Sequence, residues 1–563
     1  MDIQRLILLG ALGLVLMMIW QSWIEFQSEY AGGVGQGGNT ISATSDVPQT
    51  SNLTEDVPDA PLITQEATDG VQSIEDDVVS NTDDTALIDV KTDLVKLQID
   101  PEGGDIVRVE LVKHPVSVDM PDEPFVLMSR NNVDLFVAQS GLIGSDREYP
   151  NHNTSYTTEA FSYEMGGDDQ LIVPLRWRGV DGIEYLKEFR FSRGSYRIDV
   201  SYTIVNNSSS PWNGFFYGQL KQTERETPGS QGFLGRLPSY NGAAVYTAEN
   251  KYDKVDYDEI SDEALNASTS DGWVAMLQHY FVAAWLPQGS AAYQLYTGVS
   301  RNTPKPQYRV GYKSTVPVVI EPGQTGQIDA GLFVGPKNQK QLDAQNVEGL
   351  KLTVDYGWLT IVADPLFWLL NKIQEVVKNW GWSIILLTVL IKLIFLPLSA
   401  ASYKSMAKMK KLQPRLQTLK DRYGDDKQKF QQEMMKLYKT EKVNPAGGCL
   451  PILIQIPVFI ALYWVLLESV ELRQANFIGW LNDLSSPDPY FILPLLMGAS
   501  MLAQQLLNPA PMDPLQKKIM TALPVVFTVF FLWFPAGLVL YWVANNLLSI
   551  AQQYYITKKY QNE

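Results

Sequence analysis

Long uncharged apolar segments in the last third of the chain constrain its fold more than any other feature. Each is close to the length that a helix needs to cross a bilayer. Transmembrane helices are predicted at 381–401, 447–470, 490–507, 518–534 and 537–557. A further apolar run at 1–24 contains one basic residue, Arg5, and no clear cleavage motif follows it. We therefore expect an uncleaved signal anchor there, with a cleaved signal peptide as the alternative.

The charges of the connecting loops predict how these six spans are oriented, because cytoplasmic loops are rich in Lys and Arg. Basic residues occur in the segment at 402–446, in the loop at 508–517 and in the tail at 558–563, whereas the loop at 471–489 is acidic. Together with Arg5, this pattern places both termini in the cytoplasm. We expect a helical bundle of six spans, five of which form its core, with the region before them outside.

The region before the bundle is acidic and carries most of the formal net charge of −17, which argues against nucleic acid as its partner. Residues 25–84 contain few large apolar groups and are predicted to be a disordered tether. Residues 85–355 alternate apolar and polar positions between turns, as at Tyr196 to Ile204 after SRGS, which predicts a large antiparallel β-sandwich. A helix is expected near Asn338 to Leu350. The many aromatic residues favour a core, although a sugar or peptide cleft is the alternative.

Metal, redox and nucleotide chemistry find little support in the sequence. Cys449 is the single cysteine, and the three histidines, His114, His152 and His279, form no spacing typical of metal ligands. No GxxxxGK[ST] phosphate loop is present, so ATP is not expected as the energy source. We predict no cofactor and no enzymatic activity.

The segment at 356–380 is predicted to be an amphipathic helix. Asp364 and Pro365 can begin it, and its apolar residues share one face that Lys372 and Glu375 oppose. Tryptophans at positions 358, 368 and 380 favour a helix lying in the membrane interface. A helix packed beneath the β-domain is the alternative.

Lys392 lies in the middle of the predicted span at 381–401, where a charge costs roughly 2.5–3.5 kcal/mol on insertion scales. The predicted spans offer no carboxylate partner at that depth. They contain neutral polar residues instead: Thr388, Gln455, Gln504, Gln505, Thr528, Asn545 and Asn546. We interpret this set as a wet polar groove that opens to the cytoplasm and is closed outside by Phe530–Phe534, Tyr541 and Trp542. Hydrogen bonds that join neighbouring helices are the alternative role for each Gln or Asn.

The basic segment at 402–446 is predicted to form two helices that turn at Tyr423 and Gly424, with Asp425 or Asp426 capping the second. Apolar stripes on both helices are expected to pack the hairpin on itself. Its charge holds the loop in the cytoplasm and is expected to bind anionic lipid headgroups. Its methionines leave open a role in holding a passing hydrophobic chain.

Four stretches, SMAKMKKLQP, EKVNPAGGCLPILIQIPVF, LPLLMGASM and FFLWFPAGLVLYWVANNL, resemble the YidC family of membrane protein insertases, which includes the Oxa and Albino relatives. The anchor, tether and β-domain match the six-span Gram-negative form. The resemblance implies a protein of the bacterial inner membrane that inserts nascent membrane proteins without ATP, alone or with the Sec translocon. A periplasmic location for the β-domain is implied as well.

The resemblance also assigns roles to residues. The groove charge of the family, usually Arg, maps onto Lys392, and further groove positions map onto Thr388, Gln505, Trp542 and Asn546. The stretch of the third span that contacts substrate maps onto Cys449, Pro451, Gln455, Pro457 and Phe459. Many members contact the ribosome through a long basic tail; because this chain ends in KKYQNE, the basic hairpin would have to serve instead.

Two other classes of protein remain as alternatives. A transporter or channel would show repeated spans, broken helices or a paired ionisable relay, none of which is evident. A membrane-embedded hydrolase would pair Lys392 with a serine, for which Ser383, Ser399, Ser500 and Ser549 are available. No serine lies in a recognisable nucleophile motif.

Overall fold

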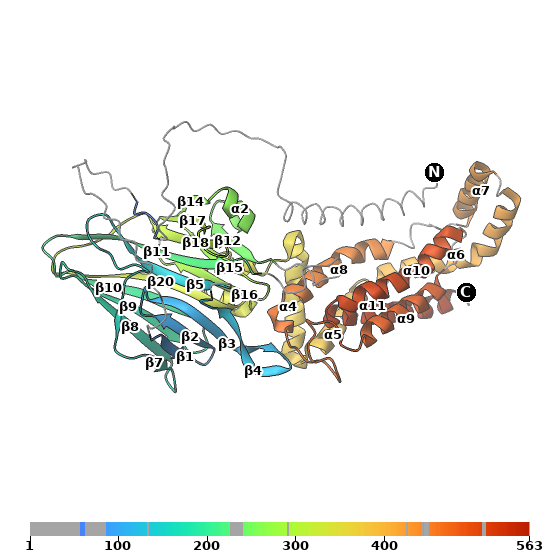
Figure 1. The fold of residues 1–563 in the computed structure, drawn as a ribbon. Coiled ribbons are helices and arrows are strands. Elements are labelled where there is room, and N and C mark those ends of the chain that lie inside the picture. Colours follow the sequence, from blue (N-terminus) through green and yellow to red (C-terminus); the bar gives the residue numbers. More distant parts are fainter. Residues whose placement is uncertain are drawn as a thin grey trace, which may run out of the picture. The chain divides into compact units, whose positions relative to one another are not determined.

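The computed structural model describes residues 57–61, 86–131, 134–225, 240–289, 292–423, 426–441, 443, 450–508 and 514–561. These residues form two units, a β-rich unit that ends at Val354 and a helical unit that begins at Asp355 (Figure 1). The predicted signal anchor at 1–24 lies outside the described residues. So does the predicted tether at 25–84, except for residues 57–61.

The β-rich unit contains two sheets, one of 11 strands and one of 9 strands. The first has the order β14 (Asn266–Thr269), β17 (Tyr293–Ser300), β18 (Gln307–Ser314), β11 (Trp212–Thr223), β5 (Phe136–Ile143), β3 (Asp105–Ser117), β2 (Val95–Asp100), β1 (Ile88–Lys91) and β7 (Ser162–Glu164), with β4 (Met120–Met128) beside β3 and β19 (Val318–Ile320) beside β11. The second has the order β13 (Lys251–Val255), β12 (Gly242–Thr247), β15 (Gly272–Leu277), β16 (Phe281–Pro287), β20 (Thr325–Pro336), β10 (Arg197–Val205), β9 (Glu184–Ser192), β8 (Gln170–Arg178) and β6 (Thr157–Thr158). Two short helices, α2 (Tyr257–Asp262) and α3 (Gln339–Asp343), complete the unit.

Large aromatic side chains fill the space between the two sheets. Phe216 of β11 meets Tyr202 of β10 and Trp285 of β16, with ring centroids 5.9 and 6.2 Å apart. The indole N–H of Trp285 donates to the backbone oxygen of Gln219 at 3.0 Å, so its polar edge is satisfied inside the core. These aromatics therefore act as core residues.

The hairpin predicted around SRGS is confirmed. Strands β9 and β10 pair antiparallel, with Ile198 opposite Phe191, and Gly194 provides the positive φ of 73° that their connection requires. The helix expected near Asn338 to Leu350 is much shorter than predicted, because α3 ends at Asp343. Asn346 at φ 52° and Gly349 at φ 73° are left-handed, which is incompatible with one continuous helix.

The helical unit contains α4 (Thr360–Val377), α5 (Trp380–Ile394), α6 (Leu396–Tyr423), α7 (Lys427–Thr440), α8 (Leu450–Glu468), α9 (Ile492–Leu507), α10 (Pro514–Phe530) and α11 (Ala536–Gln561). Helix α11 packs against α5 and α9, and α4 packs against α5 and α8. The predicted hairpin is present: Asp426 accepts a hydrogen bond from the Lys429 N–H at the start of α7. Leu412, Leu416 and Met434 form part of the core between α6 and α7.

A bend of 68° separates α5 from α6, where the sequence predicted one helix over 381–401. Pro397 has no N–H to continue the helical hydrogen bonds across the break at Phe395. Within the described residues, this bent pair combines the length and hydropathy of a membrane span, and no single helix does so by itself.

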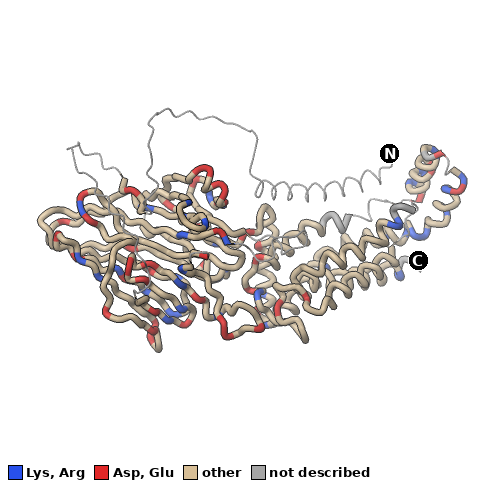
Figure 2. Tube along the Cα trace, in the orientation of Figure 1, with Lys and Arg blue, Asp and Glu red and all other residues tan. Residues whose placement is uncertain are grey.

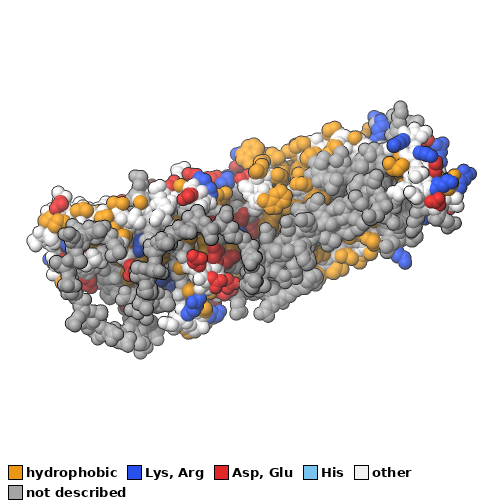
Figure 3. Space-filling view, turned by 90° about the horizontal axis from the view of Figure 1, so that it is seen from above, with side chains coloured by type: hydrophobic (Ala, Val, Ile, Leu, Met, Phe, Trp, Pro, Cys, Tyr) orange, Lys and Arg blue, Asp and Glu red, His pale blue; other side chains and the backbone are white. Residues whose placement is uncertain are grey.

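Charge and apolar surface are separated within the helical unit. Lys and Arg gather along α6 and α7 and at the end of α11, while the helices between them are nearly free of charge (Figure 2). Where the side chains of the bundle are described, much of the surface seen in Figure 3 is hydrophobic. Exposed apolar residues of α9 and α10 include Leu495, Leu506, Val525 and Val526.

Candidate functional site

Lys392 is buried in the helical unit, with 6% of its surface exposed. Its Nζ donates to Ser549 Oγ of α11 at 2.8 Å and to Gln455 Oε1 of α8 at 3.4 Å. No carboxylate among the described residues forms an ion pair with it. The ammonium is therefore held by neutral oxygens that α8 and α11 supply.

The partners of Lys392 are themselves oriented by Asn545, one turn before Ser549 on α11. Gln455 Nε2 donates to Asn545 Oδ1, which directs the Gln455 amide oxygen toward Lys392. The Ser549 hydroxyl donates to the Asn545 backbone oxygen at 2.7 Å, which leaves its lone pairs for the ammonium. Four residues on three helices thus form one connected polar cluster, which we call the Lys392 cluster: Lys392, Gln455, Asn545 and Ser549.

A small cavity of about 10 Å³ adjoins the Lys392 cluster. It is lined by Ile391, Lys392, Phe395, Leu398, Ser399 and Gln455. This volume is at the lower limit for one water molecule. A lysine has three N–H donors, and two of them are used by protein oxygens, so a water or a small polar group in this cavity would meet the third.

The other predicted groove residues do not join this cluster. Thr388 and Thr528 donate within their own helices, to Ile384 O and Pro524 O, each at 2.7 Å. Asn546 Nδ2 donates to Ser500 Oγ on α9 at 3.0 Å and so joins α11 to α9. Gln505 lies on α9 and is half-buried.

Of the predicted substrate-contact residues, Phe459 belongs to an aromatic group around Trp542, which was predicted as a groove residue. Its ring is 4.5 Å from that of Phe459 at 87°, and Phe527 and Phe531 lie at 6.2 and 5.2 Å. Phe459 thereby connects α8 to α11. Pro457 is half-buried in α8. The backbone of Pro451 belongs to α8, but its side chain is not described. Cys449 lies outside the described residues.

Ser549 and Ser500 are the residues that sequence reasoning missed as members of a polar site. Both were considered only as nucleophiles of a hydrolase. The spacing of Ser549, four residues after Asn545, places both on one face of α11 and was the available signal.

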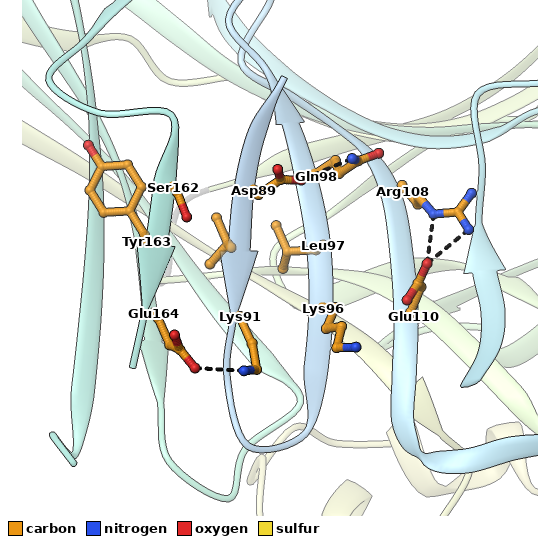
Figure 4. Close-up of a pocket in the computed structure, with 11 residues that line it drawn as sticks. Asp89, Lys91, Lys96, Leu97, Gln98, Arg108, Glu110, Ser162, Tyr163 and Glu164 are labelled. Carbon is orange, nitrogen blue, oxygen red and sulfur yellow. Dashed lines mark hydrogen bonds and ion pairs between the residues drawn. The ribbon is translucent and has the colours of Figure 1, made fainter. Parts of the chain in front are cut away.

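A second pocket, of about 270 Å³, lies in the β-rich unit on the face formed by β7, β1, β2 and β3 (Figure 4). Two ion pairs line it: Lys91 of β1 with Glu164 of β7 at 2.7 Å, and Arg108 with Glu110, both on β3, at 2.8 Å. Three cationic and three anionic side chains line it, so its charges balance. We assign it no ligand.

Two family models match the chain. The YidC periplasmic domain matches residues 87–369, and the 60Kd inner membrane protein family matches residues 372–563. A protein of Stutzerimonas stutzeri named membrane protein insertase YidC is 46% identical over 563 residues, covering 99% of each chain. The chain belongs to the YidC family. A YidC insertase of Nitrosococcus oceani is 47% identical over 567 residues, covering 100% of each chain.

Solved structures also include a YidC protein, an active YidC insertase with its first transmembrane domain resolved. It is 19% identical, covers 84% of this chain and 93% of its own, and has a TM-score of 0.37. A galactose mutarotase related enzyme of Lactobacillus acidophilus is 12% identical, covers 44% of this chain and 97% of its own, and has a TM-score of 0.30.

YidC family membership confirms a β-rich periplasmic domain followed by a helical region of the bacterial inner membrane. The family is not enzymatic, and this excludes the hydrolase alternative. The structure does bring Ser549 to Lys392, as a hydrolase would require. However, the Ser549 hydroxyl donates to the Asn545 backbone oxygen, so its proton is not directed toward Lys392.

Proposed function

We propose that this chain inserts nascent membrane proteins into the bacterial inner membrane by drawing a hydrophilic segment of each client toward Lys392. One observation carries the proposal: a buried ammonium group has only neutral partners among the described residues. A buried charge without a counterion is costly to maintain, so its presence favours a functional role. An acidic residue of a client would supply the missing countercharge during passage.

The Lys392 cluster supports transient rather than permanent binding. A client carboxylate would accept a charge-assisted hydrogen bond from Lys392, roughly twice as strong as a neutral one. Ser549 and Gln455 remain as partners when the client leaves, so the ammonium is never without acceptors. The cavity of about 10 Å³ holds no peptide, and entry therefore requires α5 to separate from α8 and α11.

Apolar client segments would leave the site between α8 and α10 into lipid. Exposed valines on α10, such as Val525 and Val529, offer an apolar surface along this route. Transfer of an apolar segment from an aqueous to a lipid environment is favourable, so release requires no ATP.

The proposed topology has six spans with both termini in the cytoplasm. This topology is supported by the distribution of charge. Lys and Arg residues gather on α6, on α7 and at the end of α11, whereas the loop before α9, at the other end of the helical unit, is acidic (Figure 2). In this topology the α6–α7 hairpin is placed to contact anionic lipid headgroups and the ribosome. Cooperation with the Sec translocon is part of the same proposal and rests on family likeness.

Site-specific photocrosslinking tests the path directly. A photoreactive residue at position 388, 392, 455 or 505 should crosslink to the hydrophilic tail and first apolar segment of a stalled nascent membrane protein. The same probe at exposed Asp169 in the β-rich unit serves as a control. Crosslinks from position 169 alone would contradict the proposed path.

Substitution of Lys392 tests the role of its charge. We expect Lys392→Arg to retain insertion of an acidic-tailed client in reconstituted liposomes, because the positive charge is preserved. Lys392→Ala should slow insertion, and Lys392→Glu should abolish it because the client carboxylate is repelled. Lys518→Ala, which removes an exposed lysine of the same unit, is the matched control. Equal rates for Lys392→Ala and the unchanged chain would exclude a role for the charge.

A further inference from the structure

Residues 57–61, VPDAP, lie against the first sheet of the β-rich unit. Val57 and Ala60 pack on a cluster formed by Ile143, Phe215 and Tyr217. The segment is separated by many residues from the first strand, β1, so this contact does not follow from local chain connectivity. It is a contact between a short linear segment and a folded surface.

The strand register builds the surface that VPDAP covers. Phe215 and Tyr217 lie two residues apart on β11 and therefore face the same side of the sheet. Ile143 of β5 is directly opposite Phe215, and Lys313 of β18 is directly opposite Tyr217. Three adjacent strands thus present an apolar patch with one lysine beside it, which we call the VPDAP surface: Ile143, Phe215, Tyr217 and Lys313.

The VPDAP surface lies on the outer side of the first sheet. Phe216, between the two aromatic residues on β11, points to the other side and packs against Trp285 of the second sheet. Ile143 and Phe215 are nonetheless almost fully buried, with 6% and 2% of their surfaces exposed. Val57 and Ala60 are part of the cover that removes these side chains from water.

Polar contacts match the segment to this surface. Lys313 Nζ donates to the backbone oxygen of Asp59 at 2.6 Å, and the Asp59 carboxylate attracts the same ammonium. Pro58 and Pro61 have no N–H, so the segment can lie on a sheet face without leaving those positions as unpaired donors. Proline also favours an extended conformation, which lowers the entropic cost of docking.

We propose that the VPDAP surface is a docking site for a short, extended, proline-flanked acidic peptide, and that residues 57–61 of this chain are its occupant. An intramolecular ligand acts at an effective concentration in the millimolar range when its linker reaches the site. The site is therefore self-occupied, and the segment fixes the midpoint of the connection between residues 24 and 86 to the β-rich unit.

Peptide binding to the full-length protein in detergent tests the proposal. The probe is a fluorescent peptide of residues 54–64, TEDVPDAPLIT, and its anisotropy reports binding. A variant with Val57→Asp and Ala60→Asp should release its own segment and bind the peptide at least about 10-fold more tightly than the unchanged chain, because the internal competitor is lost. Adding Lys313→Glu to that variant should weaken peptide binding again.

The remaining outcomes are decisive against the proposal. Equal affinity of both chains would show that the segment does not occupy the site, and absence of binding to the released variant would show that no site exists. A spin label at Asp59→Cys in a Cys449→Ser chain gives a second measurement without added peptide. The label should be immobilised and should become mobile when Val57→Asp and Ala60→Asp are added; a label that is already mobile without these two changes would overturn the docking.

Discussion

At the scale of single residues, the environment of Lys392 shows how a lysine is kept buried without a carboxylate. The Ser549 hydroxyl donates to the backbone oxygen of Asn545, and the Gln455 amide nitrogen donates to the Asn545 side chain. Their acceptors are therefore directed to Lys392 by bonds that do not involve it. We expect this orientation to be the reason why a single positive charge is tolerated.

Removal of the Ser549 hydroxyl should be more damaging than removal of an ordinary buried hydroxyl. Ser549→Ala leaves one donor of a buried ammonium group without an acceptor, so we expect stability to fall by about 1.5–3 kcal/mol. Ser549→Thr should restore it. Ser383→Ala is the matched control, because the Ser383 hydroxyl is buried in α5 and donates to Asn379 O within its own chain turn. Thermal unfolding in detergent measures the difference, and equal losses for Ser549→Ala and Ser383→Ala would contradict the assigned contact.

A second buried lysine, Lys187, lies between the two sheets of the β-rich unit. Its Nζ donates to the backbone oxygens of Gly103, Gly104 and Ser140 at 3.1, 2.9 and 3.2 Å. Burial lowers the pKa of Lys187 to about 7, although nearby Asp105 opposes this shift. Burial likewise raises the pKa of Asp105 to about 7, and its attraction to Lys187 opposes that shift.

These two shifts predict a minimum of stability near neutral pH. Between pH 3.8 and about 7 the folded chain keeps a proton on Asp105 that the unfolded chain loses, so stability falls as pH rises. Between about 7 and 10.5 the unfolded chain keeps a proton on Lys187 that the folded chain loses, so stability rises with pH. Each effect is on the order of a few kcal/mol.

Thermal unfolding of the full chain between pH 5 and 9.5 tests this prediction against a variant with Asp105→Asn and Lys187→Met. The difference between the two chains isolates the buried pair, because all other titrating groups are shared. It should pass through a minimum near pH 7. A difference that does not vary with pH would show that neither group changes protonation in this range.

At the scale of elements, the close approach of α9 and α10 depends on the absence of one side chain. A Cβ at Gly498 would lie 2.0 Å from Thr528 Oγ1, far closer than van der Waals contact. Thr528 cannot easily turn away, because its hydroxyl donates to Pro524 O. A predicted groove residue therefore has a packing role on α10.

Gly498→Ala should force the two helices apart and destabilise the helical unit by about 1–3 kcal/mol. Thr528→Ala in the same chain removes the clashing oxygen and should recover much of the loss. Thr528→Val is the matched control, because it keeps a branched side chain of similar shape and should give no recovery. Thermal unfolding of these variants measures the coupling. Additive losses for Gly498→Ala and Thr528→Ala would show that the helices do not meet there.

At the scale of the whole molecule, the separation of charge from apolar surface predicts which parts of the chain face the cytoplasm. Single cysteines can be introduced into a Cys449→Ser chain at exposed Asp169, Asn482, Thr440 or Lys559. A membrane-impermeant maleimide added to intact spheroplasts should label positions 169 and 482. Positions 440 and 559 should be labelled only after permeabilisation. Labelling of position 559 in intact spheroplasts would contradict a cytoplasmic C-terminus.

The amino-acid sequence alone determined the division of the chain into a β-rich and a helical unit. Alternation with period two marked the strands around SRGS, and long apolar runs marked the helices. It also identified Lys392 as a residue that needs an unusual environment, because the cost of burying a charge does not depend on the details of the fold. Local pattern was sufficient for these conclusions.

Only the tertiary structure decided which polar residues meet. Ser549 is 157 positions from Lys392, and no local pattern connects them. The bend at Phe395 lies within a single apolar run. Hydropathy did not predict it, because hydropathy carries no information about the direction of a helix. The docking of VPDAP depends on the register of three strands and on Lys313, which is 254 positions from Asp59. Hydrophobic periodicity reports which face of an element is buried, whereas the partner of that face is set by how the whole chain packs.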